Sequence, residues 1–343
     1  MHMADALLSP AVGAAMYGLT AAAVAKAVKE TDVSEAGQRR LPLMAVSGAF
    51  VFAAQMINFT IPGTGSSGHI CGGILLAGLL GGGPALLTIA SVLLIQCLFF
   101  ADGGLLALGA NIFNMGVIPC MIIYPLLFRP LLRRYGEKGI PAVTILSCIT
   151  GLELGAFFVV TETLVSGITE LPAGVFLGLM LPIHLAIGAV EGVITAAVFA
   201  CVKQTRPELL METVLGNAAQ SPAADAGSAA YPARSLKKTV VMLAVLAALT
   251  GGGLSLLASG YPDGLEWSME KTAGTAELER TGAVHDAAAA FQEAAAVFPD
   301  YDFKDGEGTG TSASGLIGGL MTCALAGAAG CAVVLIKRRR KAG

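Results

Sequence analysis

The feature that most constrains this chain is its recurring apolar runs, each about 20 residues long, which short polar segments separate. A helix of that length crosses the hydrocarbon core of a bilayer, which is about 30 Å thick. Only 13% of the 343 residues are charged, whereas soluble domains carry roughly 25%. The mean hydropathy of +0.73 agrees with this class. We therefore predict an all-α membrane protein, folded as a polytopic helical bundle.

The apolar runs and the positions of lysine and arginine predict about seven spans followed by two more. The expected spans cover about 6–25 and 41–60, a short piece ending at Gly81, one ending at Phe100, one ending at Arg129, and then about 140–165, 171–202, 237–258 and 315–336. Residues 206–234 are rich in Ala, Ser, Pro and Gly, which is typical of a flexible linker. We therefore expect one unit at 1–205 and a second, two-span unit at 235–343.

Basic residues indicate how the spans are oriented, because loops on the cytoplasmic side carry most of the lysine and arginine. Every basic cluster falls on one side if the N-terminus is outside and the C-terminus is cytoplasmic, which also makes the linker cytoplasmic. The loops with His69 and Asp102 then lie outside, together with a segment from about 260 to 313. That segment holds eleven acidic residues and three basic ones.

The first apolar run is expected to be a retained helix. A cleaved signal peptide opens with a positively charged region, and no lysine or arginine precedes Lys26. Retention matters for function because cleavage would remove His2.

His2 is placed where it can chelate a metal together with the chain terminus. The Met1 amine, the backbone nitrogen of His2 and its Nδ1 can form chelate rings of five and six members, which put three nitrogens in one plane. Square-planar nitrogen ligation favours Cu(II) or Ni(II) among the first-row metals. His69 lies in a loop on the same predicted face and is a candidate fourth ligand. On these residues alone, a frayed and solvated His2 is an open alternative.

Several stretches in the first 205 residues resemble one family in the same order along the chain. They read MHMADALLSPAVG, GTGSSGHICGGILLAGLLGG, LIQCLFFADGGLLALGANIFNM and PIHLAIGAVEG. All four resemble the membrane-embedded substrate-binding component of nickel/cobalt energy-coupling-factor transporters. In the second unit, SGYPDGLEWSMEK is similar to the small companion component, or PDGLE domain, which has two spans and an outside loop.

The resemblance implies a metal site and a set of partners. It implies that Ni(II) or Co(II) is held by the Met1 amine, the backbone nitrogen and imidazole of His2, and His69. The opening departs from the family's commoner form at residues 3–6, none of which is an implied ligand. The resemblance also implies a transporter subunit in the inner or plasma membrane of a prokaryote. Its partners would be lipid, the metal ion, a coupling transmembrane component and separate ATPase subunits, with no cofactor and no nucleic acid.

Other polar residues could support that site, each with a plainer interpretation beside the functional one. Asn111 and Asn114 share a helix face, so they could fix the histidine tautomers or hydrogen-bond to neighbouring helices. His184, near the outer end of its span, could support the site or pair structurally. Asp102 could attract cations, although capping of the next helix is the favoured interpretation. Ser67 completes the set of possible supporting residues.

Two other classes of function stay open at this stage. A secondary metal/proton transporter would use Glu153, Glu162 and Glu191 as proton relays. An intramembrane serine protease would pair a loop serine with His184. The protease is disfavoured because the serines lie in a glycine-rich outer loop and His2 would have no role. The sequence leaves open the choice between nickel and cobalt and the role of the acidic segment.

Overall fold

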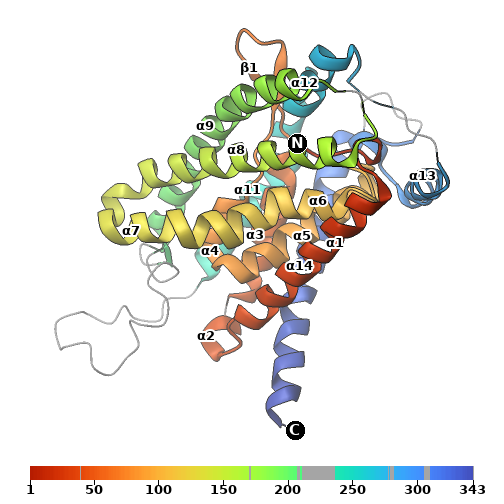
Figure 1. The fold of residues 1–343 in the computed structure, drawn as a ribbon. Coiled ribbons are helices and arrows are strands. Elements are labelled where there is room, and N and C mark those ends of the chain that lie inside the picture. Colours follow the sequence, from red (N-terminus) through yellow and green to blue (C-terminus); the bar gives the residue numbers. More distant parts are fainter. Residues whose placement is uncertain are drawn as a thin grey trace.

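The computed structural model describes residues 1–38, 40–169, 171–206, 209–210, 236–276, 278, 282–304 and 310–342, and most of these are helical (Figure 1). The N-terminal helices are α1 (Pro10–Glu30), α2 (Glu35–Gln38), α3 (Leu41–Gln55), α4 (Gly73–Leu80), α5 (Gly82–Phe100), α6 (Leu108–Ile112), the π-helix η2 (Phe113–Phe128), α7 (Arg129–Tyr135), α8 (Ile140–Ser166) and α9 (Ala173–Thr205). The C-terminal helices are α11 (Lys237–Gly252), α12 (Gly264–Ala273), α13 (Ala283–Ala295) and α14 (Thr311–Ala342). Short 3₁₀ turns are η1 (Asp5–Leu7), η3 (Gly136–Gly139), η5 (Leu254–Leu257) and η6 (Pro299–Tyr301).

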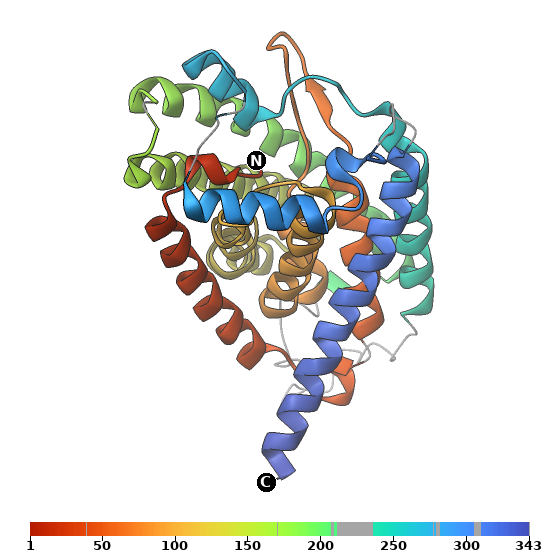
Figure 2. The ribbon, with the colours of Figure 1, turned by 90° about the vertical axis from the view of Figure 1, so that its right-hand side faces the viewer.

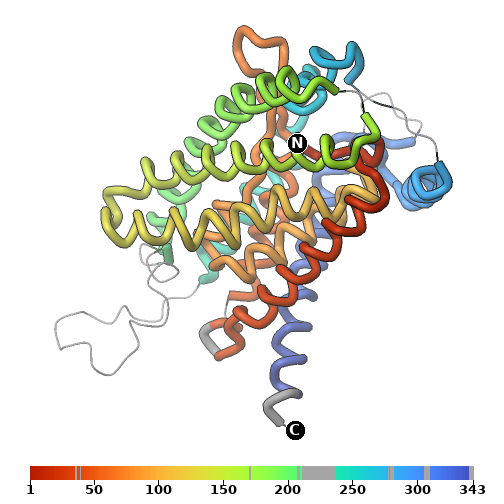
Figure 3. The backbone as a smooth tube through the Cα atoms, viewed as in Figure 1, coloured from red at the N-terminus to blue at the C-terminus, as the bar shows by residue number. Residues whose placement is uncertain are grey.

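The expectation of a multi-pass helical membrane protein is confirmed in its coarse form. Five described segments are long and apolar enough to cross a membrane: Pro10–Glu30, Gly82–Phe100, Leu108–Ser166, Ala173–Thr205 and Thr311–Arg339. The third of these is two helical legs that run in opposite directions and turn between α7 and α8 (Figure 3). The expected linker at 206–234 lies almost entirely outside the described residues.

One element departs from the expected all-α class. The span predicted at 41–60 ends at Gln55, and the chain then forms an antiparallel hairpin of β1 (Phe59–Ile61) and β2 (Ser66–Gly68). The residues of β1 are aromatic or β-branched, and Gly63 and Gly65 supply the positive φ angles, +79° and +75°, that the turn needs. The hairpin ends directly before His69.

The C-terminal segment joins the bundle along one face of α3. Both α11 and α14 pack against α3, and they also pack against each other (Figure 2). At their crossing, Gly251 and Gly315 bring the two backbones together so closely that a Cβ on either glycine would overlap the other helix. Small residues allow such close approach between helices in bilayers.

The first nine residues fold into the bundle. The backbone of Met3 is held on both sides by Asn111, with Met3 N 2.8 Å from Oδ1 and Nδ2 3.1 Å from Met3 O. Ser9 then caps α1, and Pro10 takes the first helical position. The side chain of Met3 is fully buried and that of His2 is 8% exposed, so the chain terminus is neither frayed nor solvated.

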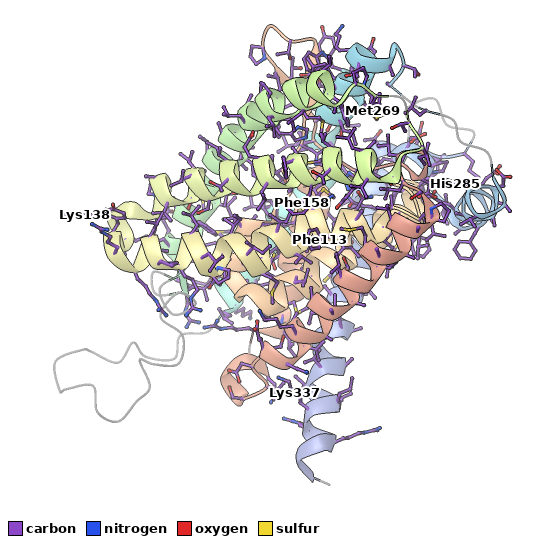
Figure 4. All side chains as sticks on the ribbon, in the orientation of Figure 1. Phe113, Lys138, Phe158, Met269, His285 and Lys337 are labelled. Carbon is purple, nitrogen blue, oxygen red and sulfur yellow. The ribbon has the colours of Figure 1, made fainter. Side chains whose placement is uncertain are left out.

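Residues 259–276 and 282–304 cover the end of the bundle where the N-terminus lies (Figure 2). Helix α12 packs on α9, and α13 packs on α5. His285, on α13, reaches the N-terminal segment with its Nε2 3.0 Å from Leu8 O (Figure 4). Gln292 on the same helix donates to Gly103 O at 2.7 Å. The acidic segment therefore contacts both the chain start and the loop after α5.

We predict that Gly315→Val destabilises the protein by pushing α11 and α14 apart, at a cost of about 1–3 kcal/mol for overpacking. The midpoint of thermal unfolding of the purified protein measures the effect. Gly178→Val is the matched control, because Gly178 is also helical but nothing lies within 4 Å of where its Cβ would be. Equal loss in the two variants would contradict the packing explanation.

Candidate metal centre

The structure brings the three predicted metal-binding residues together. The Met1 amine nitrogen lies 3.3 Å from Nε2 of His69. The rings of His2 and His69 stack, with centroids 5.2 Å apart and planes at 25°. The side chains of the two histidines are only 8% and 7% exposed. Residues that are 68 positions apart in the sequence thus share one buried cluster of nitrogen atoms.

His69 is held in place by the loop that follows it. The carboxylate of Glu191, on α9, accepts hydrogen bonds from the backbone N–H groups of Cys71 at 2.8 Å and Gly72 at 3.0 Å. Gly72 has a φ of +79° and lies against Val51, so only glycine fits this turn without strain. Glu191, whose role was open in the sequence, is therefore a structural clamp on the loop.

Both ring nitrogens of His2 have a side-chain oxygen nearby, and the neutral ring donates a hydrogen bond to one of them. Nδ1 lies 3.2 Å from Oδ1 of Asp102, and Nε2 lies 3.2 Å from Oε1 of Gln96. Asp102 also accepts a short hydrogen bond from the Tyr301 hydroxyl, which comes from the C-terminal segment. The expectation that Asp102 caps the next helix is wrong, because α6 begins at Leu108 without a side-chain cap. Asp102 instead lies directly beside Nδ1 of His2, which is one of the implied metal-binding atoms.

The two asparagines have different roles. Asn111 binds the backbone of Met3 and so fixes the segment that carries the implied ligands. Asn114 donates through Nδ2 to Glu162 at 2.9 Å. Neither of these contacts is to a histidine ring. The structure therefore does not show the two asparagines fixing the histidine tautomers.

The two loop serines are engaged in local contacts. Ser67 donates its hydroxyl to Tyr261 O at 2.7 Å and its backbone N–H to Pro262 O at 2.8 Å. It therefore fixes the start of α12 to the hairpin. The Ser66 hydroxyl lies 2.7 Å from that of Thr64. No hydrogen bond joins either serine to His184 in the described part of the chain, and the protease interpretation gains no support.

Asp263, like Gln96 and Tyr301, lies at this centre although it was not predicted from the sequence. Its Oδ2 lies 2.5 Å from the Met1 amine and 3.9 Å from Nε2 of His69. Its Oδ1 accepts from the backbone N–H groups of Leu265 and Glu266, which completes a capping box at the start of α12. The Asp-x-x-Glu spacing indicates a helix start, but nothing in the sequence places that start beside residue 1.

Burial and charge set the protonation of the cluster. Burial and the nearby terminal charge lower the pKa of both His2 and His69 to about 3, so both rings are neutral near pH 7. Burial also lowers the pKa of the Met1 amine, but the Asp263 carboxylate outweighs it and raises that pKa above its ordinary value. Burial raises the pKa of Asp263, yet the amine and His69 hold it well below its usual range. The centre thus combines neutral imidazoles with an ammonium–carboxylate pair.

The ligand chemistry of the centre is nitrogen-rich. No three His, Cys, Asp or Glu side chains within the described ranges are grouped closely enough to hold an ion. A metal here would therefore need the terminal amine or backbone nitrogen beside the two imidazoles. Neutral imidazole and amine nitrogens suit Ni(II), Cu(II) and Co(II).

Comparison with known proteins agrees with both parts of the chain. Residues 2–209 match a family model described as cobalt uptake substrate-specific transmembrane region, and residues 237–335 match the PDGLE domain. A fused nickel transport protein of Rhodobacter capsulatus is 33% identical over 225 residues, covering 61% of this chain and 64% of that protein. A cobalt transport protein of Geobacter sulfurreducens is 30% identical over 286 residues, covering 80% of this chain and 78% of that protein. A crystal structure of a truncated transition metal transporter aligns with a TM-score of 0.53 at 30% identity, over 60% of this chain and 99% of that one.

We predict that Glu191→Ala lowers stability by about 1–3 kcal/mol for each of the two loop N–H groups that lose their acceptor. Glu191→Gln should cost less, because its amide oxygen still accepts one of these bonds. Thermal unfolding of the purified protein measures both changes. Glu153→Gln is the control, since Glu153 is also in a span but its Oε1 has no hydrogen-bond partner among the described residues. If both glutamine variants lose the same stability, Glu191 is not a clamp.

Proposed function

The chain belongs to the family of cobalt uptake substrate-specific transmembrane regions, and on that premise we propose that it captures Ni(II) or Co(II) for an ATP-driven importer. The relatives named above are nickel and cobalt transport proteins, which fits a transporter subunit and not an enzyme. The energy would come from separate ATPase subunits, through a coupling transmembrane component.

The proposed ligands are four nitrogens: the Met1 amine, the backbone nitrogen of His2, Nδ1 of His2 and Nε2 of His69. One observation carries this proposal. The chain terminus is folded into the bundle, with its amine 3.3 Å from an imidazole nitrogen. Burying a terminal charge is costly, so a merely structural terminus would be expected at the surface. A metal-binding role gives a reason for that cost.

Ion binding would exchange partners at this centre. In the structure the amine pairs with Asp263, and Nδ1 of His2 lies beside Asp102. The Met1 ammonium and the His2 backbone N–H would release their protons to water on metal binding. A bound dication would then take the amine, the backbone nitrogen and Nδ1 as ligands and leave the two carboxylates beside it as counter-charges. A planar set of four nitrogens favours Ni(II) on geometry, and Co(II) can be held in the same way with less preference.

The proposed orientation puts this centre on the outer side of the membrane. Lys138 and Lys337 lie far from Met269 and His285, toward the opposite end of the bundle (Figure 4). Basic residues mark the cytoplasmic side, so residues 259–304 would face outward in a prokaryotic inner membrane. We propose about nine spans in two units, 1–205 and 235–343, with an outer N-terminus and a cytoplasmic C-terminus.

The secondary-transporter alternative has less support. Glu191 clamps a loop and Glu162 pairs with Asn114, so two of its three candidate proton relays have structural partners. We expect uptake of radioactive nickel or cobalt by cells that express the whole importer and none when the ATPase subunits are omitted. Uptake at full rate without any ATPase would favour the alternative.

We predict that one extra residue before Met1 weakens Ni(II) binding by at least about 100-fold, or about 2.7 kcal/mol. The extension leaves every side chain in place but moves the amine away from the chelate. Titration of the purified protein with Ni(II), followed by calorimetry and absorbance, measures the affinity. One extra residue after Gly343 is the control and should change nothing. Unchanged affinity in the N-terminal variant would rule out the amine as a ligand.

A further inference from the structure

His184, on α9, presents an unpaired nitrogen beside the metal centre. Its Nδ1 lies 2.8 Å from Met180 O, and because a carbonyl only accepts, Nδ1 must carry the proton. Nε2 therefore holds a lone pair. His184 is 1% exposed, and Nε2 has no hydrogen-bond partner among the described residues. A buried polar atom without a partner is destabilising, so a ligand at this lone pair would be stabilising.

His184 lines a small cavity together with residues of the centre. Met1, His69, Asp263 and Gly264 line the same cavity. Gly264 sits directly over the imidazole, because a Cβ there would come within 3.1 Å of Cε1 of His184. The absence of a side chain at Gly264 is what lets the start of α12 approach α9 at this point.

Asp263 brings a carboxylate oxygen to the same cavity. Its two oxygens have separate tasks, since Oδ1 caps α12 while Oδ2 lies 2.5 Å from the Met1 amine. The capping box fixes the direction of the carboxylate and leaves Oδ2 toward the Met1 amine. Oδ2 is also 3.9 Å from Nε2 of His69, which is one of the proposed ligands.

We propose that Nε2 of His184 and Oδ2 of Asp263 form a second position for a divalent transition-metal ion, beside the chelate. This inference rests on the proposed function. An imidazole nitrogen and a carboxylate oxygen are both ligands for Ni(II) and Co(II). The ion would replace the terminal ammonium as the counter-charge of Asp263, and it would then move to the neighbouring amine and His69.

The proposed second position is suited to brief binding of an ion on its way to the chelate, and not to tight binding. It offers two protein ligands, and the described residues include no group of three His, Cys, Asp or Glu side chains that could hold an ion. Water would fill the other coordination positions, so binding is weak and release is quick. The four-nitrogen chelate then takes the ion because it offers more ligands. One ligand comes from α9 and the other from the C-terminal segment, so the second unit takes part in loading.

The first test compares two substitutions of the same histidine in the purified full-length protein. In His184→Asn the amide can still donate to Met180 O, but the atom at the Nε2 position is lost. In His184→Gln an amide atom lies near the Nε2 position. We expect His184→Asn to slow the loading of Ni(II) about tenfold, which is about 1.4 kcal/mol in the barrier. The equilibrium affinity for Ni(II) should fall by much less than tenfold. His184→Gln should load Ni(II) at a rate between those of the wild type and His184→Asn.

Stopped-flow absorbance after mixing with Ni(II) measures loading, and titration measures affinity. Asp263→Asn should slow loading in the same way, while Asp263→Glu should retain part of the rate. Thermal unfolding shows whether each variant is folded. If His184→Asn is not folded, the loading rate of His184→Gln is compared with the wild type instead. Loading of folded His184→Asn at the wild-type rate overturns the proposal. Absence of tight binding in the wild type would instead overturn the proposed function.

The second test looks for the ion directly. The variant with one residue added before Met1 lacks the proposed chelate but keeps His184 and Asp263. We expect it to bind one Co(II) weakly, with visible absorption bands that His184→Asn removes in the same background. Absence of these bands, or their persistence in the double variant, would mean that His184 holds only water.

Discussion

The pairing of the Met1 amine with Asp263 is the contact on which the arrangement of the centre depends. Both groups are charged and largely buried, and removal of one partner from a buried pair leaves an uncompensated charge that typically costs about 3–5 kcal/mol. The pair also joins the first residue of the chain to a helix start 262 positions later. The terminal segment is also held by Asn111, and α12 also packs on α9. Both family regions therefore contribute residues to the candidate centre.

Much of the fold follows from local sequence properties. Span positions are predictable because each apolar run must satisfy its own backbone hydrogen bonds in lipid, whatever its neighbours are. The hairpin at 59–68 was not predicted, because Phe59 and Ile61 read equally well as the end of an apolar helix. Only the Pro-Gly turn that follows distinguishes a strand there. How closely α11 and α14 approach each other depends on Gly251 and Gly315, which are two among 44 glycines.

The candidate site also has a part that local sequence predicts and a part that depends on tertiary contacts. The nitrogens of residues 1 and 2 are adjacent in the chain, so their chelating geometry can be worked out from covalent structure alone. Asp263 contacts the Met1 amine from 262 residues away, and Tyr301 contacts Asp102 from 199 residues away; no local pattern reports such contacts. Asp102 shows the same limit, since a helix cap was the better local interpretation. Its actual partners, His2 and Tyr301, depend on tertiary packing.

The docking of Asp263 on Met1 also has a consequence for biosynthesis. Translation runs from the N-terminus, so Met1 is made well before α12 and α13, which follow all the helices through α9. Until those late residues emerge, the Met1 amine lacks its Asp263 partner. The centre is thus assembled in its final form only near the end of translation, so a chain released early would carry an intact first unit with an incomplete pocket.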